Sequence, residues 1–215
     1  MRSLVIALGL GLLSGCALAP QPNRWIDPAK IELTQVASSD RQWTGLAVSP
    51  EGRLFVNYPL WSESQEFAVG ELQPDGSVKP YPNQELNSWT PEKPAWLHFV
   101  CVQALLADEL GRLWILDPAN PRFEGAVKGG PKLMMVNLTS NTVIRTYRFT
   151  EEIVRPNSYL NDLRLDLEQG VAYLTDSGDG ALIVLDLESG NARRLLDDHP
   201  STEAEEITIV IEGEA

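Results

Sequence analysis

A repeat of 59 residues is the feature of this sequence that most restricts its fold. Three glycines, Gly52, Gly111 and Gly170, recur at that spacing, and each closes a polar turn between two short apolar segments. An aromatic residue follows each glycine three positions later: Phe55, Trp114 and Tyr173. Glycine reaches the positive φ that such turns require, so each repeat is expected to begin with a β-hairpin. We expect the aromatic rings to pack between neighbouring sheets.

A second hairpin follows the first in every repeat, which gives four short strands per unit. Its turns are marked by Pro-Asp-Gly at 74–76, Ser-Asn at 140–141 and Ser-Gly at 189–190. Four-stranded units repeated along a chain are typical of a β-propeller. Outside the first 15 residues, no segment has the period of a sizeable helix. The sequence therefore predicts an all-β fold, a β-propeller of four-stranded blades.

The predicted propeller occupies residues 43–215 and its ring is incomplete. Its blades cover about residues 43–84, 101–150 and 160–198, and the apolar segment 207–211 is expected to start a fourth. Closed propellers have about four to eight blades, so about three blades leave an open ring. Two explanations are considered: a truncated, non-functional fragment, or self-association in which another chain completes the propeller.

Residues 1–15 have the pattern of a secretory signal peptide: Arg2, an apolar run at 4–13, then small residues before Cys16. Such a run rises about 15 Å as a helix, too short for a hydrocarbon core of about 30 Å. Leu-Ser-Gly-Cys at 13–16 resembles the lipobox of bacterial lipoproteins, which predicts lipidation of Cys16 and attachment to a membrane. An ordinary signal with a chance cysteine is the alternative. Residues 16–42 are then a linker and lead-in strand, and the protein is expected in the cell envelope (outer membrane or periplasm) or outside the cell.

The charge balance argues against a nucleic-acid-binding protein, and the cysteine count argues against a domain held together by disulfides. A formal net charge of −13 gives no basic surface for a phosphate backbone, so nucleic acid is not an expected partner. The acidity favours a soluble surface, with some attraction for cationic ligands such as amines or Ca²⁺. Cys101 is the one cysteine besides Cys16, so the domain has no internal disulfide. Cys101 lies in an apolar run and is predicted to be a buried small residue rather than a nucleophile.

Three segments resemble the yellow / major royal jelly protein family. Segment 111–117 (GRLWILD) is similar to that family's Gly-Arg-Leu-Trp-Val-Leu-Asp signature; segments 160–163 (LNDL) and 172–178 (AYLTDSG) are similar to its Asn-Asp-Leu and Ala-Tyr-Ile-Thr-Asp-Ser segments. The resemblance covers about residues 40–200 and implies the N-terminal half of a six-bladed propeller. Family roles include dopachrome conversion, biogenic-amine binding and nutrition. The family disulfide is absent, because Leu110 stands where many insect members have Cys.

A more distant resemblance is to the regucalcin-like gluconolactonases, which are six-bladed, metal-dependent lactonases. Their metal is held by side chains at the starts of inner strands, and the repeats place Thr44, Gln103 and Asn161 there. The resemblance implies Asn161 as a ligand of Ca²⁺ or another divalent cation, with Asp162 as a further ligand-binding candidate. Thr44 stands where that family has Glu. The alternative, which we favour, is that Asn161 and Asp162 cap a strand and bond to the backbone.

The sequence favours binding of a small molecule and leaves open whether the protein is an enzyme. Trp61, Trp89 and Trp96 in predicted loops could stack on an aromatic or cationic ligand, or pack the loops onto the blades. The alternatives are a metal-dependent lactonase, a dopachrome-type tautomerase, and a module that acts through protein contacts. Converging carboxylates at the channel would favour an enzyme, whereas an aromatic-lined mouth would favour binding.

Overall fold

The computed structural model describes residues 31–62, 65–208 and 210. The chain divides into two compact units, Met1–Val36 and Ala37–Ala215, and every described strand lies in the second. The predicted signal peptide and Cys16 lie outside the described residues. Within those residues, no helix has the length and apolar character needed to cross a membrane. The helical segments described are two 3-10 turns, η2 (Ala95–Leu97) and η3 (Pro121–Phe123).

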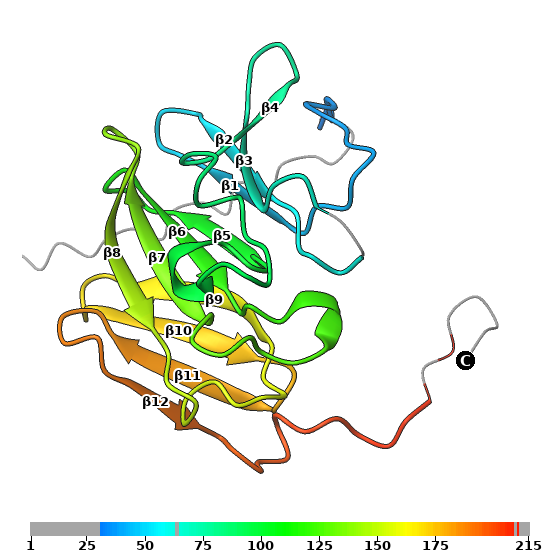
Figure 1. Ribbon diagram of the computed structural model, residues 1–215, viewed down its shortest axis with the longest axis vertical. Helices are drawn as coiled ribbons and strands as arrows, with labels where there is room; N and C mark the ends of the chain where they lie inside the picture. The colour runs from blue at the N-terminus through cyan, green and yellow to red at the C-terminus, as the bar shows by residue number, and fades with distance from the viewer. Residues whose placement is uncertain (1–30, 63–64, 209, 211–215) are drawn as a thin grey trace, which may run out of the picture. The chain divides into compact units, whose positions relative to one another are not determined.

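The described strands form three antiparallel sheets of four, and in each sheet consecutive strands are hydrogen-bonded neighbours (Figure 1). The first sheet contains β1 (Gly45–Val48), β2 (Leu54–Asn57), β3 (Val69–Leu72) and β4 (Val78–Pro80). The second contains β5 (Ala104–Ala107), β6 (Arg112–Asp117), β7 (Lys132–Asn137) and β8 (Thr142–Arg148). The third contains β9 (Leu160–Asp166), β10 (Val171–Asp176), β11 (Ala181–Asp186) and β12 (Ala192–Leu195). This is the strand order of propeller blades, and the sheets are named blades 1, 2 and 3 here.

The repeated glycines occupy equivalent turns, as the 59-residue spacing predicted. Gly52, Gly111 and Gly170 have φ of +82°, +71° and +66° and lie in the turns β1–β2, β5–β6 and β9–β10. In that left-handed region a residue with a Cβ is strained, which explains why the repeat keeps glycine. The prediction of three equivalent hairpins is confirmed.

The first strand of each blade lies on the inside of the assembly, and the loops at its start are long. β5 contacts both β1 and β9, so these three strands are neighbours. The turns at the far end of the blades have about five residues or fewer. Four of the five connections beside the strand starts are longer, namely 58–68, 81–103, 118–131 and 149–159, and the fifth, 177–180, is short. We call the end where β1, β5 and β9 begin the mouth. Long loops on a rigid scaffold are where proteins usually place binding groups.

Two hydrophobic cores join the blades, and blade 2 is buried on both faces. One core packs Phe55 of blade 1 against Leu113 and Ile115 of blade 2. The other packs Trp114 of blade 2 against Leu163 of blade 3. Strand β6 accordingly has buried residues at all but its first position, which is the apolar pattern of a strand covered on both faces. Three four-stranded blades in an open ring confirm the predicted all-β propeller fold.

The prediction for the third aromatic residue is wrong. Phe55 and Trp114 are fully buried between blades, but the Tyr173 side chain is 38% exposed. Tyr173 lies on the face of blade 3 that points away from blade 2, since its neighbours Ala172 and Leu174 belong to the core shared with blade 2. Among the described residues, no further sheet covers that face.

The predicted strand at 207–211 is not formed in the part that the structure describes. Ile207, Thr208 and Val210 have no strand assignment, and the two apolar side chains are 66% and 62% exposed. A strand needs a partner for its backbone groups, and the Ile207 amide donates instead to the Glu205 carbonyl, within a local turn.

Candidate ligand-binding site

The mouth brings three of the predicted site residues into one hydrogen-bonded row. Thr44 Oγ1 donates to the carbonyl oxygen of Gln103 at 3.2 Å, and Gln103 Nε2 donates to Asn161 Oδ1 at 3.0 Å. Thr44 and Asn161 are exposed, whereas Gln103 is buried. The row therefore runs from blade 1 to blade 3 across the starts of the inner strands.

Two aromatic residues extend this row into the loops. Tyr159 OH donates to Gln103 Oε1 at 2.8 Å and accepts a hydrogen bond from Trp61 Nε1 at 2.6 Å. Burial raises the pKa of Tyr159, so its hydroxyl stays protonated at neutral pH and remains a donor. The name mouth row is used below for Thr44, Gln103, Asn161, Tyr159 and Trp61.

An exposed aromatic ring, that of Phe123, lies beside the mouth row. Its centroid is 5.5 Å from that of Trp61 and 5.0 Å from that of Tyr159, and the ring planes are tilted by 33° and 30°. Phe123 is 60% exposed, whereas Tyr159 is buried. Each blade supplies one ring of this aromatic cluster: Trp61 comes from the β2–β3 loop, Phe123 from the β6–β7 loop, and Tyr159 from the residue before β9.

The loop that carries Phe123 has a strained backbone. Ala119, Arg122 and Phe123 have φ of +50°, +55° and +60°, a region that costs residues with a side chain about 1–3 kcal/mol each. A hydrogen bond from the Arg122 amide to the Leu60 carbonyl, at 2.7 Å, ties this loop to the loop that bears Trp61. Such strain persists where surrounding contacts enforce it, and it is found often at ligand sites. Nothing in the sequence pattern indicated it.

The buried side-chain amide of Asn57 fixes the blade 1 end of the mouth row. Asn57 Nδ2 donates to Thr44 Oγ1 at 2.9 Å and to the Val102 carbonyl at 2.8 Å, so it links blades 1 and 2. Gly45 makes room for it, since a Cβ at position 45 would overlap Asn57 Oδ1. These contacts fix the position of the Thr44 hydroxyl.

A buried polar residue ends the second strand of every blade, a signal that our reading of the sequence missed. Asn57, Asp117 and Asp176 are the last residues of β2, β6 and β10 and are all buried. The two carboxylates accept backbone N–H groups from the segment before the inner strand of their own blade, at Val100 and Tyr159 among others. The 59-residue spacing of Asp117 and Asp176 could have revealed this role.

Each of the two buried carboxylates, Asp117 and Asp176, forms an ion pair with a buried basic side chain. Lys132 Nζ lies 2.7 Å from Asp117 Oδ2, with both side chains fully buried, and Arg194 Nη1 lies 2.8 Å from Asp176 Oδ2. Lys132 Nζ also donates to the carbonyls of Ala95 and Gly130. In blade 1 the second strand ends with the neutral Asn57, one register position before that of Asp117. These ion pairs fix the loops of the mouth. Their charged atoms already have partners within the protein.

Cys101 lies behind the mouth row as a buried thiol. It is 0% exposed and unpaired, as the sequence predicted. Burial, together with the Asp117 charge, raises its pKa to about 12, which disfavours the nucleophilic thiolate. The His98 ring pairs through Nδ1 with the Pro94 carbonyl at 3.0 Å.

Asp162 is not part of the mouth row. Its Oδ1 accepts the Leu163 amide at 2.8 Å and its Oδ2 lies 2.9 Å from Arg164 Nη1. The backbone contact is of the capping kind that we favoured for this residue. Asn161 differs, because its side-chain oxygen accepts from Gln103 instead.

The donor set of the row does not fit a hard-cation site. Ca²⁺ takes six to eight oxygen ligands, usually with several carboxylates. The aligned strand starts offer one hydroxyl and two amides, and the Asn161 oxygen is already an acceptor. In the described part of the chain, no three His, Cys, Asp or Glu residues cluster in a way that could hold a metal ion.

The three loop tryptophans have different environments. Trp61 and Trp89 both pack on a small core that contains Cys101, and Trp61 also belongs to the mouth row. Trp96 is 45% exposed and lies under the guanidinium of Arg148 at 5.5 Å. Of the stacking candidates, Trp61 is therefore the one that the structure joins to the predicted strand-start residues.

Comparison with known proteins identifies relatives of this chain. A family model described as Major royal jelly protein matches residues 100–215. Protein yellow of Drosophila pseudoobscura pseudoobscura is 28% identical over 137 residues, which are 58% of this chain and 24% of that protein. Protein yellow of Drosophila yakuba is 26% identical over 183 residues, or 77% of this chain and 33% of that protein. The chain thus matches about a quarter to a third of the length of these relatives.

Solved structures of low sequence identity also superpose on the chain. A protein of unknown function from Bacteroides caccae does so with a TM-score of 0.46 at 14% identity, over 74% of this chain and 46% of that one. Hydrazine synthase from Kuenenia stuttgartiensis gives a TM-score of 0.44 at 14% identity, over 76% and 38%.

The family model covers more than half of the 215 residues, and the yellow proteins align with the chain as well. The resemblance carried by segments 111–117, 160–163 and 172–178 is confirmed. The chain belongs to the major royal jelly protein family.

Proposed function

We propose that the protein is an exported, lipid-anchored binding protein, and that the mouth binds a small, flat, cationic organic molecule. The observation that carries the proposal is the aromatic cluster of Trp61, Phe123 and Tyr159, which stands on a row of amide and hydroxyl groups. An apolar surface with a few fixed polar groups is the usual composition of a small-molecule site.

The chemistry of the cluster favours a cation with an aromatic part. Ring faces attract organic cations, by about 0.5–2 kcal/mol per contact. The net charge of −13 adds a long-range attraction for cations. Phe123, with more than half of its surface exposed, is the ring most available to a ligand. The Asn161 amide, exposed at the end of the row, offers a donor for a ligand hydroxyl or carbonyl.

Calorimetric titration with phenethylammonium tests this proposal. We expect binding to the full chain, a Kd at least ten-fold weaker for Phe123→Ala, and an unchanged Kd for Trp96→Ala. Trp96 is the matched control because it is an exposed loop aromatic outside the mouth row. Neutral phenethyl alcohol should bind more weakly than the cation. Equal losses in the two variants, or no heat for the wild-type chain, would show that the cluster is not the site.

Lipid anchoring rests on the Leu-Ser-Gly-Cys segment at 13–16. Labelled palmitate should enter the protein in a bacterial host and should not enter Cys16→Ser. Incorporation that survives this substitution would remove the anchor and, with it, the reason for placing the protein at a membrane of the cell envelope.

The metal-dependent lactonase stays an alternative, with Asn161 as its predicted ligand and Ca²⁺ or another divalent cation as its cofactor. We rank it below binding because the row has no carboxylate. Titration of the full chain with Ca²⁺, Mn²⁺ and Zn²⁺ distinguishes the two. Saturable heat that Asn161→Ala abolishes would favour the lactonase, and its absence would favour the binding protein. A tautomerase and a non-functional fragment have no specific contact in their favour among the described residues.

A further inference from the structure

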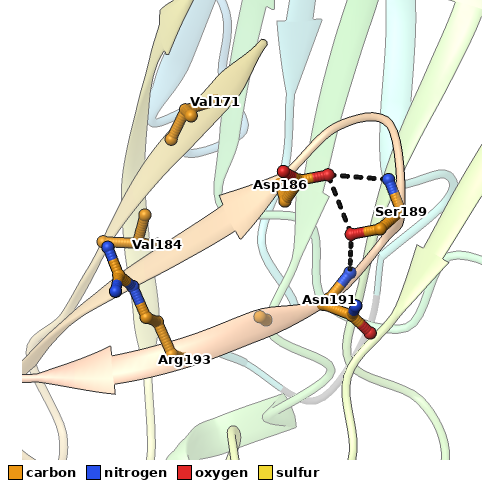
Figure 2. Close-up of a pocket in the computed structure, with 7 residues that line it drawn as sticks. Val171, Val184, Asp186, Ser189, Asn191 and Arg193 are labelled. Carbon is orange, nitrogen blue, oxygen red and sulfur yellow. Dashed lines mark hydrogen bonds between the residues drawn. The ribbon is translucent and has the colours of Figure 1, made fainter. Parts of the chain in front are cut away.

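The face of blade 3 that points away from blade 2 carries an apolar patch with two arginines, bordered by Asp162, Asp166 and Asp186. Its members alternate with the core residues of β9 to β12 and pair across the strands: Arg164, Val171, Tyr173, Leu182, Val184, Arg193 and Leu195. We call this set the open face. A hollow of about 300 Å³ lies at its edge, beside the β11–β12 turn. Figure 2 shows Val171, Val184 and Arg193 on one side of that hollow, and on the other Asp186 at the end of β11 with Ser189 and Asn191 of the turn.

The contacts between blades 1 and 2 and between blades 2 and 3 show which groups pack against such a face. At each joint, basic and tyrosine side chains of one blade donate to the second hairpin turn of the next blade. From blade 1, Arg53 Nη1 donates to the Leu138 carbonyl at 2.6 Å, and Tyr81 OH donates to Asn141 Oδ1 at 3.0 Å. From blade 2, Arg145 Nη2 donates to the Glu188 carbonyl at 2.6 Å, and Tyr147 OH donates to the Leu187 carbonyl at 2.9 Å.

Arg193 occupies in blade 3 the position that Arg145 occupies in blade 2. In blade 2, Trp114 is paired with Met135, which is paired with Arg145. In blade 3, Tyr173 is paired with Val184, which is paired with Arg193. Tyr173 and Trp114 are equivalent in the repeat, so the two arginines are equivalent as well. Arg193 is therefore placed to receive the hairpin turn of a further blade.

Blade 1 carries the complementary surface. Leu46 and Val48 of β1 are 63% and 54% exposed on the face opposite Phe55. The β3–β4 turn of blade 1 corresponds to the turns that Arg53 and Arg145 hold. Aligning Gly76 with Gly190 places Asp75 where blade 3 has Ser189. Asp75 is a fully exposed carboxylate, and its pKa is lowered by hydrogen bonds from Ser77.

We propose that a second copy of this chain docks head to tail, with its blade 1 on the open face and its Asp75 beside Arg193. The apolar residues of both surfaces would be covered, and the exposed carboxylate would meet the exposed guanidinium. The contact joins two different surfaces, so it closes into a ring if two copies complete the circle and otherwise extends as a filament. The proposal does not depend on the ligand proposed for the mouth.

Exchange of the charges tests the docking. Light scattering coupled to size exclusion, on the full chain in mild detergent, should give a mass of at least two copies. Arg193→Glu and Asp75→Arg should each raise the dissociation constant at least ten-fold. An equimolar mixture of these two variants should associate again, because each contact then pairs opposite charges. Leu110→Arg, on an exposed turn of blade 2, is the control and should leave the mass unchanged.

Two results would overturn the proposal. One is a single-copy mass for the wild-type chain at every concentration, which would mean that no second copy covers the open face. The other is association that neither charge variant weakens, or that their mixture does not restore, which would place the contact elsewhere. The equimolar mixture distinguishes lost docking from misfolding, because misfolded variants would not associate when they are mixed.

Discussion

Tyr159 is the residue at which the three blades meet. Its hydroxyl joins a side chain from the lead-in to blade 2 with an indole from a blade 1 loop, and its own backbone leads into β9. Tyr159→Phe removes one donor and one acceptor from a buried site. We expect a loss of about 1–3 kcal/mol in the free energy of unfolding, measured by urea denaturation.

Tyr173→Phe is the matched control for that change. It removes the same hydroxyl from a half-exposed ring on the open face, and a substitution of this kind usually changes stability by less than about 0.5 kcal/mol. If both variants lost the same stability, the hydrogen bonds of Tyr159 would not be what joins the blades.

Cys101 gives a prediction that depends on pH. Its pKa is raised from 9.0 to about 12 by burial and by Asp117, so the folded state favours the neutral thiol. The stability that this group contributes is fully present below pH 9 and is lost as the pH rises towards about 12, because the unfolded thiol ionises first. Cys101→Ser should therefore flatten the decline in Tm over this range.

At the scale of strands, the buried residue at the end of each second strand organises the loops. Lys132→Met leaves the Asp117 carboxylate buried without its cation, which costs about 3–5 kcal/mol of folding stability. Adding Asp117→Asn should recover much of that loss, since the neutral amide leaves no unpaired charge in the buried site. Urea denaturation of the single and double variants measures both effects. A double variant no more stable than Lys132→Met would show that the unpaired Asp117 charge is not the cause of the loss.

The strands could be predicted because their determinants are local. The positive-φ glycines and the short apolar segments around them suffice to locate the hairpins. Alignment of the repeats placed Thr44, Gln103 and Asn161 at equivalent strand starts, where the structure joins them by hydrogen bonds. Tyr173 was misjudged because its burial depends on a neighbouring sheet, which no local pattern reports.

The aromatic cluster could not be predicted from the sequence. Trp61 and Tyr159 are 98 positions apart, and the left-handed backbone at Phe123 results from loop contacts rather than from a turn residue such as glycine. Trp61 was one of three candidate loop tryptophans, and only the hydrogen bond to Tyr159 distinguishes it from Trp89 and Trp96.

At the scale of the whole molecule, two shared cores make blade 2 the centre of the domain, with the mouth at one end and the open face at one side. A ligand at the mouth would contact all three blades at once, because the aromatic cluster draws one ring from each. Ligand binding should therefore stabilise the assembly of blades, as binding to the native state alone requires.

The indole N–H signals in a ¹H–¹⁵N NMR spectrum test the central claim, that the mouth row and its aromatic cluster form the ligand site. Trp61 donates its indole N–H to Tyr159 at 2.6 Å, and Trp61→Phe identifies its signal. On titration with phenethylammonium, the Trp61 signal should move and saturate while the Trp96 signal stays in place. A Trp61 signal that does not move, or tryptophan signals that all shift alike without saturation, would contradict a binding site at the mouth.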